Sequence, residues 1–427
     1  MILSVNFLNN KIPSLPPFRR GGVRDFILQK ECRRDLRIPL FPPLEKGGWV
    51  DLRRSFLHKT ALLLVVAFFF LPGVMNAEEA RGKTSAPAKK GTRIAVYPVE
   101  NLSGIVAPVK EIRQIFIGKL RDQGVDVVEE EVLEKLMAKY RIRYTGGINR
   151  EIAKVFRQEI DTDGVLIITL EFYSDANPPK ISLISRLVST GENPAIIWMD
   201  GVGLAGDDSP GILSLGLIED PKLLLDKGIR MMVGSLLRSL SKKGEDKIIY
   251  GAKKKFQPKI SFRSPALDPD RKYTVAIVPF FNISVRKYVG EIMVLHFAGE
   301  LNRFKNFDVI ELGVVRQALL ELRIIMDQGI SLVNADSVAG MLDADLMLAG
   351  EVADYEDYQG VWGKPKVSFS AQLIERKSRE VVWSSHSYNE GDDGVFFFDL
   401  GRVNTASAMA SQMVRSIGEQ VAKEKEE

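Results

Sequence analysis

Two acidic pairs are the residues whose type and spacing best suggest chemistry. Asp207-Asp208 and Asp392-Asp393 each follow a glycine, and each precedes a Leu-Gly pair a few residues later. An anionic turn of this kind could hold a cation through hard oxygen ligands, or it could bind a basic partner. It could equally be a turn that caps the segment after it. We take these four aspartates as candidates for partner binding and predict no resident metal.

Two Asp-x-Asp pairs offer a second set of oxygen ligands. Asp161/Asp163 and Asp343/Asp345 stand where a helical stretch gives way to a strand. Aspartate commonly caps and turns the chain at such junctions. Because no third or fourth ligand recurs nearby, the pattern favours a structural role over a metal site.

The segment Gly201–Gly206 has the Gly-x-Gly-x-x-Gly spacing of a dinucleotide-binding loop. Such a loop must open a helix whose N-terminus faces the pyrophosphate. Here two aspartates, Ser209, Pro210 and a glycine follow instead. A Gly-Lys-Thr at 82–84 likewise lacks the first glycine of a phosphate loop, because Ala77 stands in that place. The sequence therefore predicts no cofactor.

Histidine, the usual general base and zinc ligand, is scarce. The chain has 3 histidines, of which His296 falls in a helical stretch and His386 just after a strand. A Ser-His-Asp or zinc arrangement would need one of these two, and no Gly-x-Ser-x-Gly sequence occurs. Paired acids for glycoside hydrolysis depend on a separation in space, so they stay open but are not indicated. We predict a protein that is not an enzyme, and rank a metal-dependent enzyme built on the Asp-Asp turns last.

Three consecutive aromatic residues, Phe396, Phe397 and Phe398, favour partner binding. Three neighbours in sequence cannot all face one core, and exposed aromatic side chains are typical contact anchors. The alternative is that they pack between domains. We include all three among the candidate partner-binding residues.

An internal duplication organises the elements that carry these residues. Arg93–Ser103 (RIAVYPVENLS) matches Thr274–Ser284 (TVAIVPFFNIS), and Ile160–Tyr173 matches Leu342–Tyr355. The offset drifts only from 181 to 185, through Val-Val-Glu at 127–129 and Val-Ile-Glu at 309–311, two tryptophans and the Gly-Asp-Asp sequences. A repeat of this length indicates two copies of one structural unit.

Each repeat predicts a small mixed sheet with helices packed on it. In the first repeat we expect a buried strand and its turn within 93–103, further strands over 125–128, 164–173, 181–188 and 195–199, and helices over 109–120, 130–139, 149–159 and 221–240. In the second, the closing helix spans 405–423. The fold class is therefore α/β, with two tandem mixed-sheet sandwich domains preceded by a signal peptide.

The N-terminal part predicts export. Basic residues at 53–59 and an apolar run over Ala61–Leu71 form a signal peptide, too short to span a bilayer and ending near Ala77. We therefore divide the chain into a non-structural extension (1–49), a signal peptide (50–77), a flexible mature N-terminus (78–91), a first domain (92–240), a linker that could hold one strand near Ile248 or Ile260 (241–272), and a second domain (273–427).

Composition excludes several classes of protein. Residues 1–77 hold 12 of the 59 Lys+Arg and 5 of the 55 Asp+Glu, so the mature chain has 47 basic and 50 acidic residues. A broad basic field for nucleic acid is absent, and no integral membrane segment is expected in the mature chain. The single cysteine, Cys32, precedes the mature region, which excludes disulfides, a thiol nucleophile and a lipidated cysteine there.

The repeat resembles the CsgG superfamily of envelope domains, which includes the periplasmic domain of the curli secretion channel, the N-terminal domain of TolB and LpoB-type lipoprotein activators of peptidoglycan synthases. The second repeat carries the resemblance best, through Pro279, Asn282, Asp345, Gly350 and Glu351. The resemblance implies a non-enzymatic domain that acts through protein contacts, often in oligomers.

Together these observations predict an exported scaffold or adaptor of the cell envelope. We expect it in the periplasm, where the outer membrane is one surface to which it could attach. Its partner is expected to be another envelope protein or a second copy of the chain. The alternative is an oligomeric secretion-channel component of the CsgG type, which would need membrane-spanning hairpins that the sequence does not show.

Overall fold

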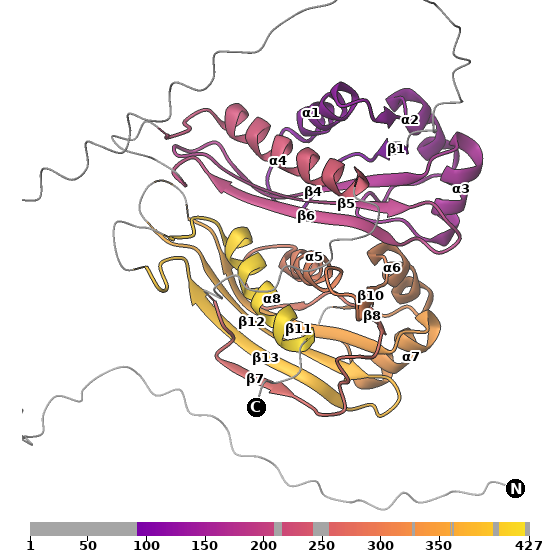
Figure 1. Cartoon of the computed structure of the whole chain (residues 1–427), viewed down its shortest axis with the longest axis vertical. Coiled ribbons are helices and arrows are strands. Elements are labelled where there is room, and N and C mark those ends of the chain that lie inside the picture. Colours follow the sequence, from indigo (N-terminus) through magenta and orange to yellow (C-terminus); the bar gives the residue numbers. More distant parts are fainter. Residues whose placement is uncertain are drawn as a thin grey trace, which may run out of the picture. The chain divides into compact units, whose positions relative to one another are not determined.

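The computed structural model describes residues 92–208, 216–241, 256–326, 329–358, 360, 363–395 and 401–422. They fall in one compact unit of the chain. The described residues form two mixed sheets and eight helices (Figure 1). The expected α/β architecture with two similar sheets is confirmed; the expected signal peptide lies outside the described residues.

The first repeat, here called copy one, contains the first sheet, here called sheet 1. Its elements are β1 (Arg93–Val96), β2 (Glu100–Asn101), α1 (Val109–Asp122), β3 (Asp126–Val127), α2 (Glu130–Lys139), α3 (Arg150–Ile160), β4 (Gly164–Ser174), β5 (Lys180–Ser189), β6 (Ile196–Ala205) and α4 (Pro221–Ser241).

Copy two contains sheet 2. Its elements are β7 (Ile260–Arg263), β8 (Tyr273–Ile277), β9 (Phe281–Asn282), α5 (Val289–Leu301), β10 (Phe307–Val309), α6 (Leu312–Glu321), α7 (Leu332–Leu342), β11 (Leu346–Glu356), β12 (Lys366–Glu375), β13 (Val381–Glu390) and α8 (Ala406–Ala422). Apart from β7, each element has a counterpart in copy one.

The two sheets share one topology. Sheet 1 has the strand order β3-β1-β4-β5-β6, and sheet 2 has the order β10-β8-β11-β12-β13-β7. The first three strands of each order are parallel, and the remainder are antiparallel. β4 is buried along most of its length, as expected for a central strand covered on both faces.

The repeated Asn-x-Ser motif forms the same turn in both copies. The Asn101 carboxamide oxygen accepts from the N–H (3.0 Å) and hydroxyl (2.6 Å) of Ser103. Asn282 and Ser284 make the same bonds at 3.1 and 2.6 Å. An Asx turn of this kind turns the chain directly after β2 and after β9, so the Asn-x-Ser motif is structural.

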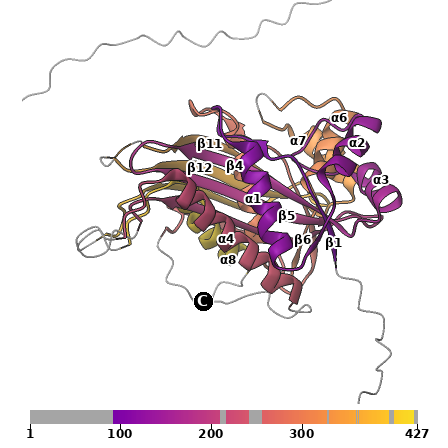
Figure 2. The same ribbon diagram turned by 90° about the horizontal axis from the view of Figure 1, so that it is seen from above.

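Each sheet carries helices on both faces. The core of sheet 1 lies under α1 and α4, whose apolar stripes include Ile112, Phe116 and Ile229. A smaller core under α2 and α3 covers one end of the opposite face. Sheet 2 repeats this arrangement with α5 and α8 on one face and α6 and α7 on the other. Viewed from above, α2/α3 and α6/α7 gather at one end of the two sheets (Figure 2).

Element boundaries agree closely with the sequence expectations except at β6. The predicted strand 195–199 is observed as Ile196–Ala205, because the Gly-Val-Gly-Leu-Ala stretch continues the strand. The segment expected to link the copies contains β7, which pairs with β13 at the edge of sheet 2.

Candidate functional site

The two Gly-Asp-Asp turns have matching geometry. They follow β6 and β13 directly, and lie at the end of the sheets opposite α2/α3 and α6/α7 (Figure 2). The N–H of Ala205 donates to Oδ2 of Asp208 (2.8 Å), and the N–H of Glu390 donates to Oδ2 of Asp393 (3.1 Å). The second aspartate of each pair therefore closes its own turn.

The glycines of these turns are also structural. A Cβ on Gly206 would come within 2.1 Å of the Ile218 carbonyl oxygen, and one on Gly391 within 2.3 Å of the Val403 carbonyl oxygen. Only glycine lets the chain return against the turn this closely.

The first aspartate of each pair takes no part in closing its turn. Asp392 is paired with Lys364 at 3.2 Å, and its side chain is about half exposed. Oδ1 of Asp207 is buried without a hydrogen-bond partner. Neither residue closes its turn, but only Asp392 presents an exposed carboxylate, whereas one carboxylate oxygen of Asp207 is covered. Phe396, Phe397 and Phe398 lie outside the described residues.

One set of contacts between the copies lies at the same end. The side-chain N–H of Asn404 donates to Oδ1 of Asp208 (3.1 Å), and the Tyr358 hydroxyl donates to Asn404 (3.3 Å). The Lys180 ammonium donates to the Tyr358 carbonyl (2.9 Å) and lies 3.0 Å from the centre of that ring. Burial lowers the pKa of Lys180 to about 8. The turn of copy one is therefore braced by copy two.

The Asp-x-Asp pairs serve the backbone. Asp161 and Asp343 end their helices with left-handed φ values of 48° and 51°. Asp163 accepts from the N–H of Arg93 (2.9 Å), and Asp345 accepts from the N–H of Thr274 (3.0 Å). These bonds tie the central strand to its parallel neighbour.

The Gly-x-Gly-x-x-Gly segment makes room for copy two. Gly203 faces the start of α8, where an added Cβ would lie 2.6 Å from Oγ1 of Thr405 and 2.9 Å from the N–H nitrogen of Ala408. Gly203 thus allows α8 to approach the sheet, and the segment does not open a helix of its own as a nucleotide loop would.

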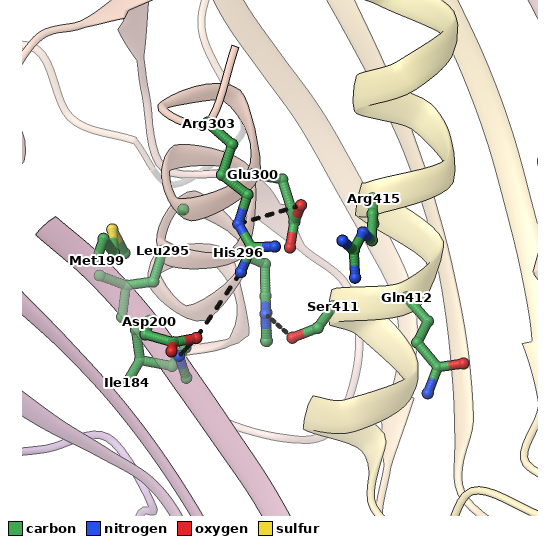
Figure 3. Close-up of a pocket in the computed structure, with 12 residues that line it drawn as sticks. Ile184, Met199, Asp200, Leu295, His296, Glu300, Arg303, Ser411, Gln412 and Arg415 are labelled. Carbon is green, nitrogen blue, oxygen red and sulfur yellow. Dashed lines mark hydrogen bonds and ion pairs between the residues drawn. The ribbon is translucent and has the colours of Figure 1, made fainter. Parts of the chain in front are cut away.

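A cavity of about 160 Å³ lies between β5, β6 and the helices α5 and α8 (Figure 3). Its lining is formed by Ile184, Met199, Asp200, Gly201, Leu295, His296, Gly299, Glu300, Arg303, Ser411, Gln412 and Arg415. Arg303 lies 3.8 Å from Asp200 and 3.7 Å from Glu300. Burial raises the pKa of the Glu300 carboxyl. The cavity thus offers both hydrogen-bond donors and acceptors.

A buried polar network adjoins the cavity through His296. The Tyr355 hydroxyl donates to Oε1 of Glu171 at 2.5 Å, and His296 Nε2 lies 3.2 Å from that hydroxyl and 3.5 Å from Oε2 of Glu171. Burial tends to raise the pKa of Glu171, but His296 and Arg286 hold it below its ordinary value. The network therefore keeps a carboxylate of copy one charged inside copy two.

His296 also lies 3.1 Å through Nδ1 from the hydroxyl of Ser411. With the proton on Nε2, this nitrogen accepts from the hydroxyl. Serine, imidazole and carboxylate thus follow one another in the order that nucleophilic hydrolases use. The carboxylate is shared with Tyr355, however, and Ser411 stands within α8, where backbone N–H groups are used by the helix. Sequence reasoning missed this cluster because its members come from β4, α5 and α8.

No group of three or more histidine, cysteine, aspartate or glutamate side chains that could hold a metal ion occurs among the described residues. Within the same ranges, no helix is long and apolar enough to cross a membrane.

Comparison with known proteins gives similarities of fold over about one copy. No family model and no curated protein matches the chain. A PelC dodecamer from Paraburkholderia phytofirmans is 18% identical over 39% of this chain and 97% of its own, with a TM-score of 0.28. Lipoprotein GNA1162 from Neisseria meningitidis is 18% identical over 36% and 99%, with a TM-score of 0.26.

The LpoB C-terminal domain from Escherichia coli is 16% identical over 27% of this chain and 82% of its own, with a TM-score of 0.21. LpoB-type proteins are also among those that the sequence resembles. The resemblance to CsgG and TolB stays a prediction, and nothing about activity follows from similarities at this level.

Proposed function

We propose that this chain is an exported, non-enzymatic protein of the cell envelope that works as a scaffold or adaptor by binding another protein. The observation that carries this proposal is that both Gly-Asp-Asp turns lie at one end of the two sheets. Turns from both copies lie there, joined through Asp208 and Asn404, while Asp207 and Asp392 are not used to close them. An exposed carboxylate on a braced turn, such as that of Asp392, suits recognition of a basic surface.

The packing between the copies supports a scaffold. Arg186 of copy one and Glu311 of copy two form an ion pair that is 1% and 0% exposed. Gly147 and Gly313 meet so closely that a Cβ on the first would lie 2.7 Å from the N–H nitrogen of the second. Two units held in one relative position present their surfaces as a single composite site.

The test is partner capture from the envelope of the native host. Residues 78–427, carrying a photo-crosslinking side chain near the shared turns, are expected to capture one partner reproducibly, and D207N/D392N to capture at least threefold less. D126N, which alters a half-exposed aspartate at the opposite end of sheet 1, is the matched control. Equal capture by all three forms would refute a role for these turns.

Two further measurements separate the alternatives. The native mass of the captured material distinguishes an adaptor with one partner from a large closed ring, which the channel alternative requires. A fluorophosphonate probe tests the enzyme alternative at Ser411: stoichiometric labelling that is lost in S411A would replace the proposal with a hydrolase.

A further inference from the structure

The free edge of β6 differs from its counterpart in copy two. In sheet 2, β13 is covered at this edge by β7, with Trp383 opposite Arg263 and His386 opposite Ile260. In sheet 1, β6 ends the strand order among the described residues. Copy two contacts the start of this edge, where Ala195 bridges Ile310 and the Asn302 side chain donates to the Ile196 carbonyl (3.4 Å). From Ile197 onward, no strand of the described residues pairs with the edge, which leaves this part open to strand addition.

The backbone groups at this edge can be assigned from the repeat. In copy two, the carbonyls of Val382 and His386 accept from Ser264 and Lys259, so their backbone groups face β7. With the offset of 185, their counterparts are Ile197 and Gly201. The N–H of Gly201 donates to the Asp200 side chain (2.9 Å), a bond that an added strand would replace. An unpaired strand edge that presents such groups is a template for another strand.

The edge also borders the cavity described above, because Met199, Asp200 and Gly201 belong to both. Directly opposite residues of an antiparallel pair point to the same face. A residue paired with Gly201 would therefore direct its side chain toward α5 and α8, and Gly201 has no side chain in its way. In copy two the residues in this position, Ile260 and Phe262, are 68% and 52% exposed, because α6 and α7 pack over β8, β11 and β12 on that face and not over β7.

We propose that the β6 edge binds an extended segment of a partner protein, which adds to sheet 1 as an antiparallel strand and places an amide side chain, glutamine or asparagine, in the cavity. This rests on the proposed function. An amide fits because Arg303 and Arg415 offer donors while Asp200 and Glu300 offer acceptors around the same space (Figure 3).

The chain's own sequence favours a partner over self-supply. By the offset of 181, the counterpart of β7 is the segment 79–82, Glu-Ala-Arg-Gly, whereas β7 reads Ile-Ser-Phe-Arg. Glutamate, alanine and glycine are poor strand formers, while isoleucine and phenylalanine are good ones. A strand for this edge is thus better provided by another protein.

The experiment uses residues 78–427 and a peptide that copies residues 259–264, the segment that covers β13. Two versions are compared, with isoleucine or glutamine at the position of Ile260. We expect the glutamine peptide to bind roughly tenfold more tightly by fluorescence anisotropy, since one more satisfied buried polar contact is worth about that factor. Binding should slow amide exchange at Met199, which would lie opposite the position of Phe262, without changing exchange along β13.

Peptide N-methylation provides a control that leaves the protein unaltered. Methylation at the positions of Ile260 and Phe262, whose N–H groups face the edge strand, should abolish binding. Methylation at the positions of Ser261 and Arg263, whose N–H groups point away from the edge strand, should leave binding unchanged. In the protein, G201P should lose binding, and E300A/R415A should remove the preference for glutamine while the affinity for the isoleucine peptide stays within twofold.

Several results would overturn the inference: no slowing of exchange at the β6 edge with either peptide, equal effects of the two methylation patterns, protection of these amides in the free protein, or a dimer by light scattering that pairs two β6 strands. If G201P folds and still captures its host partner, the partner docks elsewhere. The proposed function would then survive the failure of this inference.

Discussion

Arg186 and Glu311 lie 125 residues apart and form a buried pair joined by two hydrogen bonds, Nε to Oε2 at 3.2 Å and Nη2 to Oε1 at 3.1 Å. Nη2 also donates to the carbonyl of Gly146 (2.6 Å). Glu311 is the last residue of the Val-Ile-Glu motif, and its counterpart Glu129 is exposed and paired locally with Arg121. One repeated motif thus serves two purposes, and only the second copy uses it to hold the copies together.

Removing one partner of this pair should destabilise the contact between the copies strongly. R186A or E311A leaves a buried charge unpaired, for which we expect a loss of about 3–5 kcal/mol in the free energy of unfolding. The double variant R186M/E311L should recover much of that loss, because apolar residues of similar volume avoid the desolvation of two charges. Urea unfolding of the wild type, the two single variants and the double variant gives the four free energies of unfolding to be compared.

R121M/E129L is the matched control, since that pair joins exposed side chains of copy one. It should change stability by under about 1 kcal/mol. If R186A were equally mild, the ion pair could not be what fixes the two copies.

The close approach of α8 to β6 gives a second prediction. G203A places a Cβ 2.6 Å from Thr405, so the copies must separate locally, at a cost of about 1–3 kcal/mol. A Cβ added at Gly191 would meet nothing within 4 Å, and G191A should be close to neutral. Thermal unfolding of both variants would report the change. Equal stability of G203A and G191A would contradict it.

Asp357 predicts a specific pH dependence. Burial raises the pKa of its carboxyl to about 6, although Arg286 acts in the opposite direction. The folded state therefore binds a proton more tightly than the unfolded state between about pH 4 and 6. Stability from this group is complete below pH 4 and is lost as the pH rises through 6, by up to about 3 kcal/mol.

The measurement compares wild type with D357N across pH 4–8, since the difference between their unfolding free energies isolates this group. The wild type should lose stability relative to D357N up to about pH 6, and the difference should then stay constant. D345N is a control aspartate of the same copy that bonds a backbone N–H. A difference for D357N that rises with pH, as for an ordinary salt-bridged carboxylate, would show that Arg286 outweighs burial.

Most of the fold could be read from the sequence because the repeat presents each element twice. The Pro-x-x-Asn-x-Ser turns and the helix ends at Asp161 and Asp343 are local, and local rules place them. The length of β6 was missed because glycines discourage a strand prediction, whereas here they admit α8.

The site between the copies could not be predicted in the same way. His296 and Ser411 stand 115 residues apart, and Glu171 and Tyr355 stand 184 apart. No local pattern indicates that these side chains meet, because their meeting depends on how one copy packs on the other. The Asp-Asp turns could be recognised as sequence motifs. Only the backbone hydrogen bonds show that the second aspartate of each pair closes the turn and the first does not.

The different roles of the two aspartates in each turn give the last prediction. D208A and D393A remove the acceptor that closes each turn, and each should cost about 1–2 kcal/mol. D207A and D392A should leave stability within about 0.5 kcal/mol and reduce partner capture.

Replacing Phe397 and Phe398 by alanine should also weaken capture while circular dichroism and urea unfolding stay unchanged. Capture that follows stability in all of these variants would mean that the turns act only as structural elements. Capture that is lost in D207A/D392A at full stability would instead identify the carboxylates as the contact that the partner's basic side chains recognise.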